Sequence, residues 1–430
     1  MNPPVFALYD NNNFYASCEK LFDPLLKDRP VVVLSNNDGC IVARSAEAKK
    51  LDVKMGAPWF KLRDLARQHG IVAMSSNYEL YADLSDRVVE VLRQFTPSLE
   101  IYSIDEAFLD LSGFRTLDLT SYGHEIRARV LEWVGLPGCV GIGPTKTLAK
   151  LSNFCGKKNL AGEGGVCNFL AMRPSDLDKL FARIEVGEVW GVGQKLGVKL
   201  RDMGIVSVLD LRRADIAMIR SRFSVVLERT VRELNGLSCI ALEEISPDKQ
   251  QIMCSRSFGE SVYELDGLCD AIATYVGRAA EKLRGQRSVA AVLMVFLQTN
   301  PFKAEEPQYH PSMTVRLPEP SADTRILVHR ALQLIQRIFR PGYAYKKAGV
   351  MLAGIQPAVI AQQSMFGAPT GTDGRAEMLM AVMDGINQKW GRGTLRVAAE
   401  RQHHPWLMRR NRLSPRYTTA WDELPVALAK

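Results

Sequence analysis

The stretch IYSIDEAFLD, residues 101–110, places two adjacent carboxylates, Asp105 and Glu106, among apolar residues. Burying one unpaired carboxylate is costly, and a second one beside it raises the cost. Neighbouring residues of a strand point to opposite faces, so the two acids can meet at one place only near a strand end or a turn. Asp10 ends another strand-like segment, VFALYD, and could complete the cluster.

Three carboxylates and a backbone carbonyl supply the oxygen ligands that suit Mg²⁺. Two such ions about 4 Å apart could hold the attacking and leaving oxygens of a phosphoryl transfer. The pattern therefore predicts a magnesium site made of Asp10, Asp105 and Glu106. Taken alone, these residues leave a second interpretation open, which is an acidic turn exposed to water.

A basic group follows the acids in the chain. Lys146, Lys150 and Lys157 are spaced i, i+4 and i+11 in PTKTLAKLSNFCGKKN, which puts them on one side of a predicted helix. A solvated helix face would show the same pattern. Beside a cluster of acids, however, a lysine could neutralise a triphosphate. Lys49, on an earlier short helix, is a second candidate for that contact.

A short glycine motif, GVG, lies between two helical stretches. Gly191 and Gly193 would let backbone amides approach a phosphate closely, and Lys195 follows them. An ordinary helix-to-helix turn would have the same sequence.

The segment AQQSMFG has the composition of a short peptide that binds a hydrophobic pocket, with Gln362, Met365 and Phe366 as its anchors. A loop with a stray apolar pair is the alternative interpretation.

These groups need elements that position them. The first 170 residues or so mix strands and helices, with acids at strand ends and lysines on a late helix. Short helical segments follow over 171–240, and residues 251–353 read as strand, helix, strand, strand, helix, strand. We therefore expect a multidomain fold that combines α/β and α+β parts.

The length, charge and cysteine content of the chain limit the classes of protein to which it can belong. A chain of 430 residues should hold several domains. Its net charge of +8 favours an anionic partner such as nucleic acid. Eight cysteines without a CxxC pair argue against a zinc site and for reduced thiols. The longest apolar stretch is too short to cross a bilayer, and the N-terminus lacks the features of a secretory signal. We expect a cytoplasmic protein without a membrane partner.

Three stretches resemble the signatures of Y-family translesion DNA polymerases: DNNNFYASCE (10–19), YSIDEAFLDL (102–111) and GIGPTKTLAKLSN (141–153). Further stretches, including VVVLSNNDGCIVARSAEAKKLDVKMGAPWF, SSNYELYADLSDRV, FSVVLERTVRELNG and LSPRYTT, are similar to the polymerase V branch of that family, the UmuC type. The resemblance runs along essentially the whole chain.

The resemblance implies a right-hand polymerase. The palm would be residues 1–20 and 78–170, with small fingers over 21–77. A helical thumb with its helix-hairpin-helix would cover 171–240, and a little-finger domain 243–353. Residues 354–430 would be a C-terminal tail that carries a clamp-binding peptide and a basic segment.

The resemblance also implies roles for individual residues. Asp10, Asp105 and Glu106 would be the catalytic carboxylates that bind two Mg²⁺ ions, and the backbone carbonyl of Asn11 would be a further ligand. In the nucleotide site, Tyr15 would be the steric gate that rejects a 2′-hydroxyl. The remaining nucleotide-binding positions would be Phe14 beside the gate and the lysines Lys49 and Lys157. Gly191, Gly193 and Lys195 would contact DNA, and Gln362, Met365 and Phe366 the sliding clamp.

Two positions depart from the family pattern. Ala46 stands where many members carry a tyrosine that touches the triphosphate, so that contact would be absent. Asn12 replaces an aspartate that is common in the broader family. Neither departure affects the three acids.

The implied activity is error-prone, template-directed DNA synthesis across lesions in the SOS response, on primer-template DNA with deoxynucleoside triphosphates. The implied partners are the sliding clamp, a dimer of a self-cleaved accessory protein of the UmuD type, and RecA, and the enzyme would be associated with the nucleoid. Two alternatives remain at this point. A nucleotidyl cyclase would use similar acids but would not need the hairpin or the clamp peptide. A non-catalytic regulator that holds DNA and clamp would tolerate loss of the acids.

Overall fold

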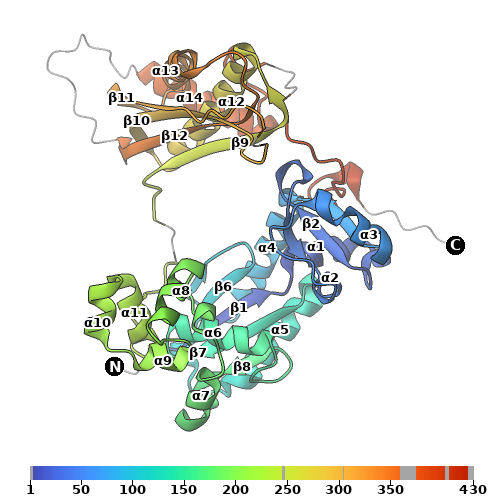
Figure 1. Ribbon diagram of the computed structural model, residues 1–430, viewed down its shortest axis with the longest axis vertical. Helices are drawn as coiled ribbons and strands as arrows, with labels where there is room; N and C mark the ends of the chain where they lie inside the picture. Colours follow the sequence, from blue (N-terminus) through green and yellow to red (C-terminus); the bar gives the residue numbers. More distant parts are fainter. Residues whose placement is uncertain (1–2, 245–246, 304, 359–373, 402–405, 425–430) are drawn as a thin grey trace. The chain divides into compact units, whose positions relative to one another are not determined.

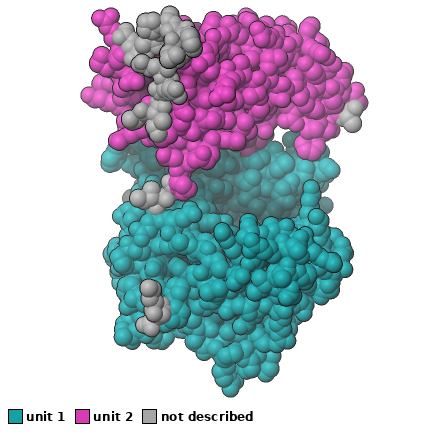
Figure 2. Space-filling view, turned by 90° about the vertical axis from the view of Figure 1, so that its left-hand side faces the viewer, with its two compact units in different colours: residues 1–35, 39–246, 412–430 teal, residues 36–38, 247–411 magenta. Residues whose placement is uncertain are grey.

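The computed structural model describes residues 3–244, 247–303, 305–358, 374–401 and 406–424. The chain divides into two compact units, coloured separately in Figure 2. Unit 1 comprises residues 1–35, 39–246 and 412–430, and unit 2 comprises 36–38 and 247–411. Each unit is described by itself below.

The centre of unit 1 is a five-stranded sheet with the order β5-β6-β1-β7-β8 (Figure 1). All neighbouring pairs are antiparallel except β7 and β8. One face packs against α4 and α5, and the other against α6. The bounds of these elements are β1 Phe6–Asn11, α4 Tyr78–Leu92, β5 Leu99–Ile101, β6 Glu106–Asp110, α5 Leu119–Val134, β7 Gly138–Gly143, α6 Lys146–Lys157 and β8 Val166–Asn168.

The alternation of side chains along β1 decides which residues meet α6. Every residue of FALYDN is buried, as expected for a strand that is covered on both faces. Phe6 and Leu8 pack with Ala149 of α6, whereas Ala7 and Tyr9 join the core on the opposite face. Because the side-chain period of a strand is two, Asp10 falls on the same face as Leu8, toward α6.

A glycine on β7 lets α6 approach the sheet. Gly141 lies opposite Leu8 in the register, and a Cβ atom added there would lie 2.0 Å from the backbone nitrogen of Asn153. The side-chain amide of Asn153 then donates hydrogen bonds to the carbonyls of Leu8 (3.2 Å) and Cys139 (3.0 Å). The helix is thereby tied directly to two strands of the sheet.

Two smaller groups of elements complete unit 1. A three-stranded sheet of order β3-β2-β4 packs with short helices, and five helices surround a separate apolar core that includes Leu148 and Leu151 of α6. The first group has the bounds α1 Phe14–Phe22, β2 Val31–Leu34, β3 Ile41–Arg44, α2 Ala46–Lys50, α3 Arg63–His69 and β4 Val72–Ser75. The second has α7 Pro174–Phe181, α8 Gln194–Asp202, α9 Val208–Arg213, α10 Ile216–Arg222 and α11 Val225–Leu234.

Unit 2 is an antiparallel sheet of order β11-β10-β12-β9 that packs against two helices, α12 and α13. A third helix, α14, is held by an ion pair between Arg284 and Asp384 at 2.6 Å. The bounds are β9 Ile252–Val262, α12 Leu265–Gly285, β10 Ser288–Thr299, β11 Ser312–Ser321, α13 Thr324–Ile338, β12 Tyr345–Pro357 and α14 Gly374–Trp390.

The expected fold class is confirmed, as is the order strand, helix, strand, strand, helix, strand after residue 251. Within the predicted C-terminal tail over 354–430, residues 374–390 form a helix and residues from 412 onward belong to unit 1. The boundaries of palm, fingers, thumb and little finger stay predictions. Among the described residues, no helix is both long and apolar enough to cross a membrane.

Gly141→Ala should destabilise unit 1, because the new methyl group would force α6 away from the sheet. Overpacking of this kind typically costs about 1–3 kcal/mol. The measurement is the free energy of unfolding from denaturant titration. Gly113→Ala is the matched control, because a Cβ atom at Gly113 meets nothing within 4 Å. Equal stability of the two variants would contradict the close-approach explanation.

Candidate active site

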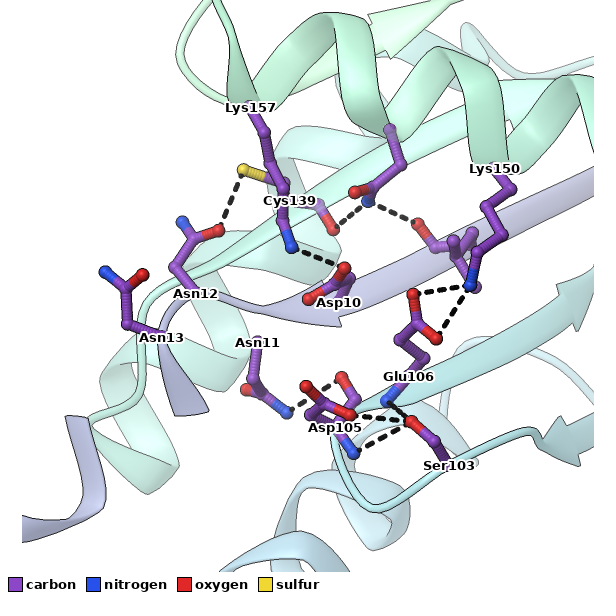
Figure 3. Close-up of polar contacts among 12 residues, drawn as sticks. Asp10, Asn11, Asn12, Asn13, Ser103, Asp105, Glu106, Cys139, Lys150 and Lys157 are labelled. Carbon is purple, nitrogen blue, oxygen red and sulfur yellow. Dashed lines mark hydrogen bonds and ion pairs between the residues drawn. The ribbon is translucent and has the colours of Figure 1, made fainter. Parts of the chain in front are cut away.

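The three predicted acids lie at the ends of adjacent strands, as shown in Figure 3. Asp10 pairs with Glu106 in the antiparallel register of β1 and β6, and Asp105 immediately precedes β6. Directly opposite residues of an antiparallel pair share a face, and like charges in that position repel each other. The strands therefore create a local excess of negative charge that other groups must balance.

Two lysines of α6 provide positive charge at this point. Lys157 forms an ion pair with Asp10, and the Lys150 ammonium donates to both carboxylate oxygens of Glu106, at 2.7 and 2.8 Å. The same ammonium lies 4.6 Å from the centre of the Tyr102 ring. Asp105 is held differently, because its carboxylate accepts a hydrogen bond of 2.6 Å from the Ser103 hydroxyl.

The charge state of Asp10 reflects this environment. The pKa of Asp10 is raised to about 6, mainly by burial and also by the neighbouring carboxylates of Glu106 and Asp105, against the opposing effect of Lys157. A carboxyl group with a raised pKa gains negative charge only as the pH rises through that value. Any chemistry that needs ionised Asp10 should therefore weaken as the pH falls through about 6.

The donor chemistry of the site fits a hard divalent cation. Carboxylate and carbonyl oxygens are the ligands such ions take. The buried amide of Asn11 adds another, because its side-chain oxygen has no hydrogen-bond partner among the described residues. Within the part of the chain that the structure describes, no three His, Cys, Asp or Glu side chains are gathered closely enough to hold a metal ion. A bound cation would have to take over the carboxylates that Lys150 and Lys157 contact.

A cavity of about 440 Å³ opens beside the acids. The acidic residues Asp10 and Asp105 line it together with cationic side chains and two aromatic rings. The predicted nucleotide-binding residues are all among its lining: Phe14, Tyr15, Lys49 and Lys157. The residues predicted from sequence patterns and from the family resemblance thus come from four separate segments that the fold brings to one cavity.

Several positively charged side chains lie close together on one side of the cavity. Burial lowers the pKa of Lys49, and the positive charges of Lys157, Arg44 and Lys158 lower it further. The Lys49 ammonium donates a hydrogen bond to the Asn13 side chain. A lysine whose pKa is lowered by neighbouring positive charges favours an anionic ligand such as a phosphate chain.

The ring of Tyr15 stacks on that of Tyr81, with centroids 4.4 Å apart and an interplanar angle of 16°. Phe14 lies beside it, with its ring centroid 5.7 Å from that of Tyr15. Tyr15 also meets Tyr78 edge to face. The wall of the cavity at Tyr15 is therefore a packed aromatic group.

The third lysine of the helical series has a different role. Lys146 is 2% exposed and forms an ion pair with Glu100 at 2.6 Å, away from the three acids. Glu100 also accepts a hydrogen bond from the backbone nitrogen of Glu243 at 2.7 Å. Lys146 thus stabilises packing within unit 1, whereas Lys150 and Lys157 face the acids.

The remaining predicted sites lie elsewhere. Gly191 has a φ of +88°, Gly193 caps the N-terminus of α8, and both are exposed together with Lys195. The element before this turn is a single 3₁₀ turn, Val186–Glu188, rather than a full helix. The clamp-peptide residues Gln362, Met365 and Phe366 lie outside the described residues. In the basic segment, Arg401 and Arg409 pair with acids of unit 2.

Sequence reasoning missed two residues of the site. Ser103 holds Asp105 and also accepts hydrogen bonds from the backbone nitrogens of Asp105 (3.3 Å) and Glu106 (3.1 Å). Its position two residues before an acid, in a turn, was the available signal. Arg44 lines the cavity from the end of β3, and no periodicity in its segment distinguishes it from a surface arginine.

Comparisons with known proteins match most of this chain to one family. Residues 9–153 match the impB/mucB/samB family, residues 249–365 match the C-terminal domain of that family, and residues 377–427 match a domain of unknown function. Protein UmuC of Salmonella typhimurium is 48% identical over 98% of this chain and 99% of its own length. DNA polymerase IV of Pelotomaculum thermopropionicum is 28% identical over 91% of this chain and 94% of its own.

Among solved structures, a Y-family DNA polymerase chimera covers 82% of this chain and 99% of its own length. The TM-score is 0.64 at 19% sequence identity. At this level of identity the likeness concerns the fold.

Lys49→Gln should weaken binding of inorganic tripolyphosphate to the metal-free protein by about tenfold, because one charge-assisted contact is lost. Since an anion restores the lowered pKa of Lys49, binding to the wild type should take up protons and strengthen as the pH falls through the titration of that lysine. Isothermal titration calorimetry in buffers of different ionisation enthalpy measures both effects.

The matched control is Lys54→Gln, which changes a lysine that is exposed and does not line the cavity. If the two variants bind tripolyphosphate equally well and with equal proton uptake, the cavity is not the anion site.

Proposed function

Because the chain belongs to the impB/mucB/samB family, and so to the Y-family of DNA polymerases, we propose that it is a template-directed DNA polymerase that copies damaged templates in the SOS response. The single observation that carries the proposal is the cavity in which Asp10 and Asp105 lie next to Lys49, Lys157 and Tyr15. That combination suits a ligand with a triphosphate, a sugar and a reacting phosphorus atom.

The acids would act on the reacting end of the nucleotide. Asp10, Asp105 and Glu106, with the backbone carbonyl of Asn11, would hold two Mg²⁺ ions, which lower the pKa of a primer 3′-hydroxyl and neutralise the departing pyrophosphate. Ser103 keeps the Asp105 carboxylate oriented through its hydrogen bond of 2.6 Å. Lys150 and Lys157 form ion pairs with Glu106 and Asp10 before the ligand arrives.

The cationic residues would bind the triphosphate. Lys157 would move from Asp10 to the phosphate oxygens, and Lys49 would contact them as a point charge without the bidentate geometry of arginine. Arg44 lines the same cavity and adds to its positive potential. Ala46, at the start of α2, has no hydroxyl to offer, so these cations would carry the contact alone.

DNA and protein partners extend beyond the cavity. The exposed turn at Gly191 and Gly193 would offer backbone amides to a DNA phosphate, assisted by Lys195. The peptide around Gln362, Met365 and Phe366 would bind the sliding clamp. The UmuD-type dimer and RecA remain proposals that rest on the family resemblance.

A non-catalytic regulator that holds DNA and clamp is the competing function. Such a regulator would account for the net positive charge of the chain, but it would not need acidic and cationic side chains in one cavity. Family membership likewise favours a polymerase over a nucleotidyl cyclase.

Asp105→Asn should abolish primer extension across an abasic template site, with a loss of at least about a hundredfold, because it removes a carboxylate from the reacting centre. The assay contains Mg²⁺, the clamp, the accessory dimer and a RecA filament. Asp83→Asn, on the outer part of α4, is the control and should extend like the wild type. Equal extension by wild type and Asp105→Asn would remove the acids from the chemistry, and failure of the wild type despite normal DNA binding would favour the regulator.

Tyr15→Ala should raise ribonucleotide incorporation by at least about tenfold relative to deoxyribonucleotides, because a 2′-hydroxyl would no longer collide with the ring. Single-nucleotide insertion kinetics with matched dATP and ATP give the ratio of kcat/KM values. A ratio equal to that of the wild type would contradict the steric-gate role.

Deletion of residues 362–366 should lower clamp affinity and shorten the products made with clamp present. The lost contacts are the apolar anchors Met365 and Phe366, whose removal should cost about tenfold or more in affinity. Fluorescence titration of labelled clamp measures binding, and synthesis without clamp should be unchanged. Normal clamp affinity in the deletion variant would place the contact elsewhere.

A further inference from the structure

The C-terminal segment 412–418 is built into unit 1 next to the helices that flank the cavity. Ser414 is 5% exposed, and the Asn77 amide donates hydrogen bonds to its carbonyl oxygen (3.1 Å) and its hydroxyl oxygen (3.0 Å). Arg412 and Ser75 exchange two hydrogen bonds, at 2.9 and 3.0 Å. The ring of Tyr417 stacks on Phe22 of α1 at 4.8 Å.

Asn77 connects this segment to α4. Its side-chain oxygen caps the helix by accepting a hydrogen bond from the backbone nitrogen of Leu80 at 3.3 Å. Its amide nitrogen is the group that binds Ser414 and, at 3.2 Å, the carbonyl of Pro415. The buried Asn77 side chain therefore bonds to the helix through its oxygen and to the C-terminal segment through its nitrogen.

A buried carboxylate of α1 has no part in the proposed chemistry. Glu19 of α1 is 1% exposed, and its carboxylate accepts a hydrogen bond of 2.5 Å from the Tyr81 hydroxyl. Burial raises the pKa of Glu19, and the hydrogen bond from the Tyr81 hydroxyl opposes the shift. The second carboxylate oxygen of Glu19 has no hydrogen-bond partner among the described residues. A buried acid that accepts such a hydrogen bond fixes the direction of the hydroxyl that donates it.

The Tyr81 ring passes this fixed position on to the cavity. It is fully buried on α4 and stacks against Tyr15, which lines the cavity beside Asp105. One series of contacts therefore runs from Glu19 through Tyr81 to Tyr15. A second runs from Ser414 through Asn77 to the start of α4, the helix that carries Tyr81. Rotation or displacement of the Tyr81 ring would remove the surface against which the Tyr15 ring rests.

We propose that Glu19, Tyr81 and Ser414 are positioning residues that hold the Tyr15 ring for sugar selection. Part of a C-terminal region matched to a domain of unknown function thereby contributes to the selectivity of the nucleotide site. The proposal rests on the proposed role of Tyr15 as the steric gate. It adds that the gate is set by hydrogen bonds from a segment about 400 residues further along the chain.

The test is the ratio of kcat/KM for dATP to that for ATP in single-nucleotide insertion by the full-length protein with its partners. Tyr81→Phe and Ser414→Ala each remove one hydroxyl and should lower the ratio by about three- to tenfold. The change should come mainly from a lower KM for ATP, with kcat for dATP within about twofold of wild type. Glu19→Gln, which can still accept the Tyr81 hydrogen bond, should keep a ratio closer to wild type than Glu19→Leu.

Tyr122→Phe is the matched control. It deletes a hydroxyl of the same unit whose hydrogen bond, 2.8 Å to the Phe95 carbonyl, lies outside this series, and it should leave the ratio unchanged. Tyr15→Ala tests the gate itself in the same assay.

The outcomes separate the two levels of the proposal. If Tyr15→Ala lowers the ratio but Tyr81→Phe and Ser414→Ala do not, the positioning series is wrong and the gate stands. If the variants lose dATP and ATP incorporation equally, their role is merely structural and the proposal fails. If Tyr15→Ala leaves the ratio unchanged, the gate is wrong and the positioning proposal fails with it.

Discussion

The antiparallel register of β1 and β6 is the constraint on which the site depends. It sets Asp10 opposite Glu106 on the face of the sheet that α6 covers, next to Asp105. Like charges in such a pair repel, and burial removes the water that would screen them. The arrangement is stable only if positive charge is supplied, and Lys150 and Lys157 of α6 supply it.

Several other features follow from that requirement. The helix can bring its lysines to the acids because Gly141 lets it pack directly on the sheet. In the proposed function, the same lysines would transfer to an anionic ligand when a cation takes over the carboxylates. The cavity beside them collects further cations, Lys49 and Arg44, and is bounded by the Tyr15 ring. The balance of charge around the partly buried acids thus matters both for the stability of the fold and for the binding of a ligand.

Much of this could be predicted from the sequence, and the exceptions have physical causes. The acids could be predicted because two strand-like segments each end in a carboxylate. The order of strands and helices in unit 2 could be predicted because apolar residues recur there with the periods of strands and helices. Helix α14 could not be predicted in this way, because Met380 is its only buried residue among those described. The helix depends instead on the ion pair between Asp384 and the distant Arg284. Nothing local in FYASCEKLF marks Glu19 as buried, because its hydrogen-bond partner, Tyr81, lies far away in the sequence.

The central claim is that Asp10, Asp105 and Glu106 together bind the cation that replaces the lysines, and iron(II)-directed backbone cleavage tests it most directly. With Fe²⁺ and ascorbate, the account predicts cuts near the ends of β1 and β6. Excess Mg²⁺ should suppress these cuts, and they should be absent from Asp105→Asn. Cleavage confined to other parts of the chain, or unchanged cleavage in that variant, would contradict the account.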